Sequence, residues 1–241
     1  MENVLITGGA GGIGSAIAQL LCSKGYGVIV LDNNNKNIND LQKLHKGISC
    51  YNVDVTNISQ LKECYNEISK KCIIDHIVCL AGRALEDEWK SFEEQDLNEI
   101  HKSIEVNLLG HINVIHSFLP LIKKSKNNKT ITLISSINAF SDFGLPAYSA
   151  SKSGMYGLVK CLCSEFGRYN IRINSISPGT IVTPATEKEP KDFEKLLRST
   201  AIGHFATKED VADMVSFIIN NNGITGQNFV IDAGQSVVLK K

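Results

Sequence analysis

Several features are absent from this sequence, and each absence argues against a class of protein. No hydrophobic run approaches the length of a membrane span, because apolar stretches such as Val28-Ile29-Val30-Leu31 have the length of a strand. Net charge is absent too: 25 Lys+Arg balance 25 Asp+Glu, so the overall charge favours neither nucleic acid nor an acidic membrane as a partner. No C-x-x-C pair and no His cluster at zinc-site spacing is present, so we expect no metal site.

The cysteines and the N-terminus indicate a cellular compartment. The seven cysteines form an odd set, and several stand in apolar periodic segments, where a free thiol acts as a small hydrophobe. This favours a reducing intracellular compartment. The chain goes directly into an apolar run at Val4, without the basic segment and long apolar core of a signal peptide. We therefore expect a cytoplasmic protein.

A strand, a glycine-rich turn, a helix and a second strand are predicted in succession at the start of the chain. Residues 4–7 and 28–31 have the pattern of buried strands, and 15–24 that of a helix. Glycines let the turn approach a pyrophosphate closely, and the helix N-terminus offers N–H groups to that anion. We expect dinucleotide contacts from Gly8, Gly11, Gly12, Ile13 and Gly14.

Asp32 closes the second strand and bears on the choice of cofactor. Its carboxylate can accept hydrogen bonds from both hydroxyls of the adenosine ribose, and it would repel a 2′-phosphate. No arginine stands in the glycine turn or directly after Asp32, and Lys36 is the nearest cation. This favours NAD(H) over NADP(H). An aspartate before asparagines can also simply form a turn.

Further strands alternate with helices, which predicts an α/β fold. Strands are expected at 48–53, 73–80, 130–135, 171–177 and 229–231, and helices at 39–46, 58–71, 97–118, 153–169 and 207–220. Thr207 and Asp210 resemble a capping box for the last helix. The pattern predicts one Rossmann-type doubly wound domain over 1–241, with a mostly parallel sheet of about seven strands flanked by helices. An excursion at about 183–206 is expected to lie over the site as a lid or substrate loop.

Ligands of such folds bind at the carboxyl ends of the strands, which selects further positions. Asp54 and Val55 follow the third strand, where an adenine edge would pass. Ala81 and Gly82 follow the fourth, where small residues let a cofactor lie close to the sheet. The charged loop at 83–96 contains Trp89, which we expect to pack the loop against the body together with Phe92.

Tyr148 and Lys152 stand four residues apart at the start of a predicted helix, so their side chains share one face. An ammonium beside a phenol favours the phenolate, so we expect the pKa of Tyr148 to fall from about 10 toward the range of general acid–base catalysis. By itself such a pair is also common on solvated helix faces. Asn107 interrupts the apolar stripe of the helix at 97–118, as either a structural tie or a site residue.

In combination, these motifs resemble the short-chain dehydrogenase/reductase family. The matching segments, in the family's order over residues 7–184, are Thr7-Gly8-Gly9-Ala10-Gly11-Gly12-Ile13-Gly14, Asp54-Val55, Ala81-Gly82, Asn107, Ser135-Ser136, Tyr148-x-x-x-Lys152, Pro178-Gly179-Thr180 and Thr183-Pro184. The resemblance implies hydride transfer between a nicotinamide cofactor and a carbonyl or alcohol, with residues 8–184 spanning both the cofactor site and the catalytic set.

The resemblance also implies a role for each matched residue. Tyr148 is the general acid/base, and Lys152 lowers its pKa and binds the nicotinamide ribose. Asn107 holds a water that links Lys152 to solvent, and a serine binds the substrate oxygen. Ser135 and Ser136 stand thirteen and twelve residues before Tyr148, and both spacings occur in the family. We favour Ser136, the later serine of the pair.

The nicotinamide pocket and one departure from the family complete the comparison. The resemblance implies that Pro178 and Gly179 shape the pocket, that Thr183 binds the carboxamide, and that Ile181 offers backbone groups to it. Cys79-Leu80 replaces the family's common Asn-Asn before Ala81-Gly82, which puts a local side-chain brace between strands in doubt.

The predicted function is an NAD(P)(H)-dependent oxidoreductase that interconverts a secondary alcohol and a ketone. A 3-oxoacyl-thioester reductase is one specific alternative, and a catalytically silent nucleotide-binding regulator of the same fold is another. A nucleotide-sugar epimerase or dehydratase would need a larger C-terminal substrate domain than this chain has. The expected partner is a small carbonyl or alcohol substrate, which Arg83 and Arg198 would meet if it were anionic. The resemblance implies a homo-tetramer or dimer formed through the long helices.

Overall fold

A seven-stranded parallel sheet forms the centre of the molecule. The computed structural model describes residues 1–141, 144–183 and 193–238. The strands stand in the order β3-β2-β1-β4-β5-β6-β7, and every neighbouring pair is parallel. Their bounds are Asn3–Thr7 (β1), Gly27–Asp32 (β2), Ile48–Asn52 (β3), His76–Cys79 (β4), Lys129–Ile134 (β5), Ile171–Pro178 (β6) and Asn228–Ile231 (β7). The predicted doubly wound Rossmann-type fold is confirmed.

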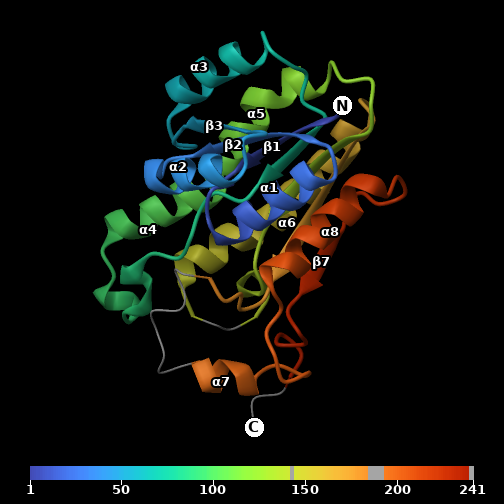
Figure 1. Ribbon diagram of the computed structural model, residues 1–241. Coiled ribbons are helices and arrows are strands. Elements are labelled where there is room, and N and C mark those ends of the chain that lie inside the picture. Colours follow the sequence, from blue (N-terminus) through green and yellow to red (C-terminus); the bar gives the residue numbers. More distant parts are fainter. Residues whose placement is uncertain (142–143, 184–192, 239–241) are drawn as a thin grey trace.

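Helices cover both faces of this sheet. The described α-helices are α1 (Gly12–Ser23), α2 (Asn35–Leu44), α3 (Ile58–Ile68), α4 (Leu97–Ile104), α5 (Gly110–Ile122), α6 (Pro146–Gly167), α7 (Phe193–Arg198) and α8 (Lys208–Asn220), of which α7 lies away from the sheet (Figure 1). Buried side chains of α1, α2 and α8 form one core with one face of the sheet, and those of α3, α5 and α6 form the other. Figure 1 shows α1 and α8 next to each other on the near side of the sheet.

Local caps explain where several helices begin. The Asn34 side chain accepts a hydrogen bond from the Asn37 N–H, so α2 begins four residues before the predicted start at 39. The predicted capping box at α8 is present, because the Thr207 hydroxyl accepts from the Asp210 N–H and the Asp210 carboxylate accepts from the Thr207 N–H. None of the described helices combines the length and apolar character that a membrane span requires.

The predicted helix at 97–118 is divided into three parts. Between α4 and α5 lies one turn of π-helix, η3 (Glu105–Leu109), and α5 continues to Ile122. Such π turns are rare and occur frequently at functional sites. Apolar spacing alone predicts the helix but not the change of winding within it.

Thr7 supplies the brace that the substitution of Cys79-Leu80 put in doubt. Its hydroxyl oxygen accepts hydrogen bonds from the backbone N–H groups of Leu80 (3.1 Å) and Ala81 (3.2 Å). The ends of β1 and β4 are therefore joined through one buried threonine.

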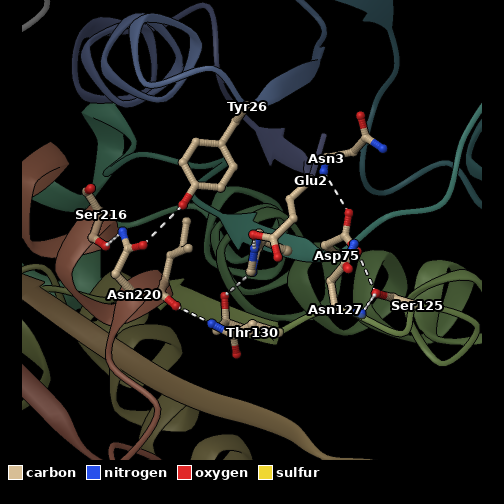
Figure 2. Close-up of polar contacts among 12 residues, drawn as sticks. Glu2, Asn3, Tyr26, Asp75, Ser125, Asn127, Thr130, Ser216 and Asn220 are labelled. Carbon is tan, nitrogen blue, oxygen red and sulfur yellow. Dashed lines mark hydrogen bonds and ion pairs between the residues drawn. The ribbon is translucent and has the colours of Figure 1, made fainter.

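A polar network joins the amino ends of β1, β4 and β5, at the opposite edge of the sheet from the glycine-rich turn (Figure 2). Asp75 is 2% exposed, and its carboxylate accepts from the Asn3 N–H (2.7 Å), the Asn127 amide (3.0 Å) and the Ser125 hydroxyl (2.5 Å). Buried carboxylates are tolerated where such donors surround them. This edge therefore has a structural role.

Replacing Asp75 by alanine tests that role. Asp75→Ala leaves three donors without their acceptor, and we expect the free energy of unfolding to fall by about 2–3 kcal/mol. Chemical denaturation measures the change. Asp40→Ala is the control, because Asp40 is exposed and its contact with Lys43 is a surface ion pair, so the loss should stay below about 0.5 kcal/mol.

Candidate active site

The predicted site residues meet at the carboxyl edge of the sheet. All neighbouring strands are parallel, so the segments that follow them emerge at the same edge. The predicted cofactor positions on these segments are Gly8, Gly11, Gly12, Ile13, Gly14, Asp32, Asp54, Val55, Ala81, Gly82, Pro178, Gly179, Ile181 and Thr183.

The glycine-rich turn is held between β1, β2 and α1. The Gly8 N–H donates to the Leu31 carbonyl (2.7 Å), and the Ala10 N–H donates to the Asp32 carboxylate (3.0 Å). Gly11 caps α1 without a side-chain hydrogen bond from any described residue. The first turn of α1 therefore presents backbone N–H groups and the positive end of the helix dipole, which suit a pyrophosphate.

Gly12 gives this turn its fit to a dinucleotide. A Cβ added at Gly12 would stand 2.8 Å from Cγ2 of Thr183, closer than real Cβ atoms come. A side chain there would therefore fill the space between the turn and the segment after β6. Glycine keeps that space free, and the residues present fit a nicotinamide dinucleotide whose pyrophosphate lies against α1.

Asp32 is anchored at the end of β2. One carboxylate oxygen accepts the Ala10 N–H and the other accepts the Asn34 N–H, each at 3.0 Å. Both oxygens keep lone pairs for further donors. Lys36, the nearest cation along the chain, is exposed in the first turn of α2.

Asp54 and Val55 shape the loop after β3. One Asp54 oxygen accepts from both the N–H and the hydroxyl of Thr56, at 2.9 and 2.8 Å. The Val55 carbonyl accepts from the Asn113 amide on α5 (3.1 Å). This loop is thus tied to the helix that carries the next site residues.

Tyr148 and Lys152 lie on α6, which is fixed to the end of β5. Tyr148 is in the first turn, because Pro146 begins the helix. The Lys152 ammonium donates to the Ile134 carbonyl at 2.9 Å, and its Nζ lies 5.4 Å from the centre of the Tyr148 ring. The Ser135 hydroxyl donates to the Lys152 carbonyl at 3.0 Å, so Ser135 serves the docking of the helix.

Ser136 lies beside the phenol. It is close enough to lower the pKa of the Tyr148 phenol, and its hydroxyl donates to the Asn138 Oδ1 at 3.1 Å. Asn138 was not selected from the sequence. The two serines therefore differ in surroundings: Ser135 faces the backbone of α6, and Ser136 faces the Tyr148 side chain.

The expected fall in the pKa of Tyr148 is wrong for this structure. Burial raises the pKa of Tyr148 to about 12, the hydrogen bond from Ser136 lowers it, and the Glu88 carboxylate raises it. Burial also lowers the pKa of Lys152 to about 7, and its ammonium donates to a backbone carbonyl. Desolvation therefore outweighs the attraction between ammonium and phenolate. Tyr148 therefore stays protonated at neutral pH.

Asn107 occupies the middle of the π turn η3 and is fully buried. Its amide nitrogen donates to the carbonyls of Arg83 (2.9 Å) and Ser103 (3.0 Å), whereas its Oδ1 has no hydrogen-bond partner among the described residues. A Cβ at Gly82 would stand 2.2 Å from that oxygen, and Gly82 has φ +133°. Gly82 therefore lets the segment after β4 pass directly against Asn107.

His111 is a site residue that sequence reasoning missed. It is fully buried on α5, and its Nε2 donates to the Ala81 carbonyl at 2.7 Å. Burial lowers the pKa of His111 to about 3, and the positive charge of Lys152 lowers it further. Its spacing of four residues after Asn107 was the available signal.

The loop at 83–96 differs from expectation. Trp89 and Phe92 are 62% and 67% exposed, so they do not pack the loop against the body as predicted. Glu88 holds the loop against the body instead. It is 3% exposed, and its carboxylate accepts hydrogen bonds from the Ser103 hydroxyl and from the Tyr148 N–H. Residues 184–192 of the predicted lid lie outside the described residues. Arg198 is exposed and paired with Glu194.

Comparison with known proteins places this architecture in a family. A family model described as enoyl-(acyl carrier protein) reductase matches residues 8–236. A solved short-chain dehydrogenase/reductase family oxidoreductase from Burkholderia thailandensis matches with a TM-score of 0.88 and 28% identity, over 97% of this chain and 92% of that chain. The chain belongs to the short-chain dehydrogenase/reductase family. It is therefore an oxidoreductase of this family.

Other relatives of this short-chain dehydrogenase/reductase extend the comparison. A 3-oxoacyl-(acyl-carrier-protein) reductase of Thermotoga maritima is 34% identical over 238 residues, covering 95% of this chain and 96% of the relative. The solved structure of ElxO with NADP bound is 31% identical with a TM-score of 0.89, over 97% of this chain and 98% of that chain. A Brucella melitensis 3-oxoacyl-(acyl-carrier protein) reductase with bound NAD is 26% identical with a TM-score of 0.89, over 98% and 91%. The family binds NAD(P).

The burial of His111 predicts a specific dependence of stability on pH. The folded protein holds His111 neutral down to a pKa of about 3, whereas in the unfolded chain it takes up a proton near pH 6.5. Between these values the unfolded state binds more protons, so unfolding becomes easier as pH falls, by about 1.4 kcal/mol per pH unit. We expect His111→Gln to reduce the slope of unfolding free energy against pH by about this amount between about pH 4 and 6.

Denaturant unfolding at several pH values measures this slope. His101→Gln, which changes an exposed histidine of α4, is the matched control and should keep the wild-type slope. Equal slopes in the wild type and in His111→Gln would contradict the assignment.

Proposed function

We propose that this chain reduces a ketone to a secondary alcohol with NAD(P)H, with Tyr148 as general acid and Ser136 as the donor that binds the substrate oxygen. The observation that carries the proposal is the placement of Ser136, at the end of β5, close enough to Tyr148 on α6 to lower the pKa of its phenol, beside the buried Lys152 amine. Two neighbouring hydroxyls can both reach one carbonyl oxygen. The same residues serve the reverse reaction with Tyr148 as base.

The cofactor supplies the hydride, and the chain supplies position and the proton. The turn of Gly8, Gly11, Gly12, Ile13 and Gly14 would bind the pyrophosphate, and Pro178, Gly179, Ile181 and Thr183 would bind the nicotinamide end. Lys152 would contact the nicotinamide ribose. Asn107, whose buried Oδ1 has no partner in the described part of the chain, would hold a water near Lys152. Ala81 and Gly82 have small side chains or none, so the nicotinamide ring could approach the edge of the sheet closely.

A 3-oxoacyl thioester is the substrate class that the comparisons favour. The relatives from Thermotoga maritima and Rickettsia prowazekii are both named 3-oxoacyl-(acyl-carrier-protein) reductases, at 34% and 31% identity. The general alcohol–ketone activity remains the broader form of the proposal.

We further propose that residues 1–241 work as one domain and assemble as a dimer or tetramer. One sheet contains strands from both ends of the chain, which supports a single unit. Exposed apolar side chains at Leu109, Phe217 and Val230 support assembly, because monomers gain little from exposing them. Size-exclusion chromatography with light scattering tests it, and a monomer at micromolar concentration would contradict it.

Tyr148→Phe tests the catalytic assignment. The variant loses the acid, and we expect turnover of a 3-oxoacyl thioester to fall by about a thousandfold or more while NADH still binds. NADH oxidation measures turnover, and thermal shift with cofactor measures binding. Full activity in Tyr148→Phe would refute the mechanism. Ser135→Ala and Ser136→Ala form a matched pair, and the larger loss of kcat is expected for Ser136→Ala.

Asp32 predicts a preference for NADH. Its carboxylate would accept from the ribose hydroxyls and repel a 2′-phosphate, so Asp32→Ala should shift the ratio of kcat/KM values toward NADPH by roughly tenfold or more. Asp40→Ala on the exposed face of α2 is the control and should leave the ratio unchanged. A wild-type enzyme that already prefers NADPH would contradict the role of Asp32.

A further inference from the structure

Glu88 is a buried carboxylate that belongs to none of the predicted site positions. It lies in η1 (Glu86–Trp89), a short 3-10 turn of the loop after β4, and is 3% exposed. Glu86 and Trp89 on either side of it are exposed, and three of the four residues of EDEW are acidic, so the pattern indicates a solvated turn. Burying a carboxylate costs free energy unless hydrogen-bond donors surround it. The donors around Glu88 therefore indicate why it is buried.

Three segments donate to the Glu88 carboxylate. Oε2 accepts the backbone N–H of Tyr148 at 2.7 Å, and Oε1 accepts the Ser103 hydroxyl of α4 at 2.6 Å and the Leu85 N–H at 3.3 Å. Ser103 in turn accepts from the Asn107 amide through its backbone carbonyl at 3.0 Å. Glu88 thus connects the loop to α4 and to the first turn of α6.

The start of α6 depends on this distant cap. Leu145, the N-cap residue, has φ +60° and makes no side-chain cap hydrogen bond among the described residues. That conformation is strained for leucine, and its side chain has no acceptor to offer. The first turn contains no acidic residue of its own, so the carboxylate at the N-terminus comes from Glu88.

We propose that Glu88 is a positioning residue for Tyr148: its carboxylate caps α6 from the loop at 83–96 and thereby fixes the phenol beside Ser136. This inference rests on the proposed role of Tyr148. The same contact links the loop to the catalytic helix, so a ligand that moves Glu88 also moves the first turn of α6.

The electrostatic surroundings of this contact are simple. Tyr148 and Lys152 on α6, His111 on α5 and Glu88 are ionisable side chains of the site, and Glu88 acts on Tyr148 while Lys152 acts on His111. Ser103 from α4 and Asn107 from η3 are neutral. On the turn, Asp87 is paired with Lys90. The Glu88 charge acts on Tyr148 in the direction that keeps the phenol protonated.

Glu88→Gln and Glu88→Ala separate charge from geometry. Glutamine keeps an acceptor for the Tyr148 N–H but removes the charge, whereas alanine removes both. We expect Glu88→Ala to lower kcat by roughly ten- to a hundredfold with little change in the KM for cofactor, and Glu88→Gln to recover part of the loss. Glu86→Gln, an exposed acid of the same turn, is the matched control and should behave as wild type.

Ultraviolet titration of the Tyr148 phenol gives a readout that does not need turnover. Tyr148→Phe is made both in the wild type and in Glu88→Gln. Subtracting the titration of each Tyr148→Phe variant from that of its parent leaves the Tyr148 signal. We expect the ionisation in Glu88→Gln to occur at lower pH than in the wild type, because the like charge is gone. Circular dichroism checks the fold, and if Glu88→Ala does not fold, Glu88→Gln decides.

The outcomes separate this inference from the proposed function. Wild-type turnover in Glu88→Ala, together with an unchanged phenol titration in Glu88→Gln, would overturn the role of Glu88. Full activity in Tyr148→Phe would overturn the proposed function, while a shifted phenol titration in Glu88→Gln would still show that Glu88 acts on Tyr148.

Discussion

The contact between α6 and the carboxyl end of β5 is the constraint on which the site depends. Three hydrogen bonds make it: Lys152 Nζ to the Ile134 carbonyl, Ser135 Oγ to the Lys152 carbonyl, and Ser153 Oγ to the Ala139 carbonyl. They fix both the rotation of the helix and its position along the strand. Tyr148, one turn before Lys152, then reaches Ser136. A register error of one residue would turn the phenol away by about 100°.

Around this contact, polar groups are buried without full hydrogen bonding, which a purely structural core would avoid. Lys152 is buried and donates to the Ile134 carbonyl, Asn107 and His111 each keep one buried polar atom unpaired among the described residues, and Leu145 is strained. Each of these features costs about 1–3 kcal/mol. They lie within the same part of the fold, as expected where stability is given up for a preorganised site. The Asp75 network at the opposite edge is, by contrast, fully hydrogen-bonded.

Local patterns predicted the fold and most of the site's placement. The strand periodicity, the glycine-rich turn and the Thr207 capping box each depend on residues near one another in sequence. These features can therefore be predicted from the sequence alone. The position of Ser136 near Tyr148 follows from chain order and strand ends. Glu88 could not be found in this way, because its partner Tyr148 stands 60 residues away. His111 had only its spacing from Asn107 as a local signal, and its partner Ala81 stands 30 residues away. The same limit explains Trp89, whose exposure depends on what packs beneath its loop.

The direction in which the pKa of Tyr148 is shifted is the main point on which the prediction from sequence and the folded structure differ. In sequence, the nearest charge is Lys152, and attraction between unlike charges predicts a lower pKa. In the fold, burial acts on both partners, raising the pKa of the phenol and lowering that of the amine, and the carboxylate of Glu88 adds to the first effect.

A phenol that holds its proton is suited to give it to a carbonyl oxygen that gains negative charge. An amine whose pKa lies near 7 is suited to replace that proton, because it exchanges with solvent near neutral pH. Burial, the same effect that forms the core, thus shifts the pKa values of Tyr148 and Lys152 in opposite directions, so that the phenol keeps its proton and the amine can lose one near neutral pH.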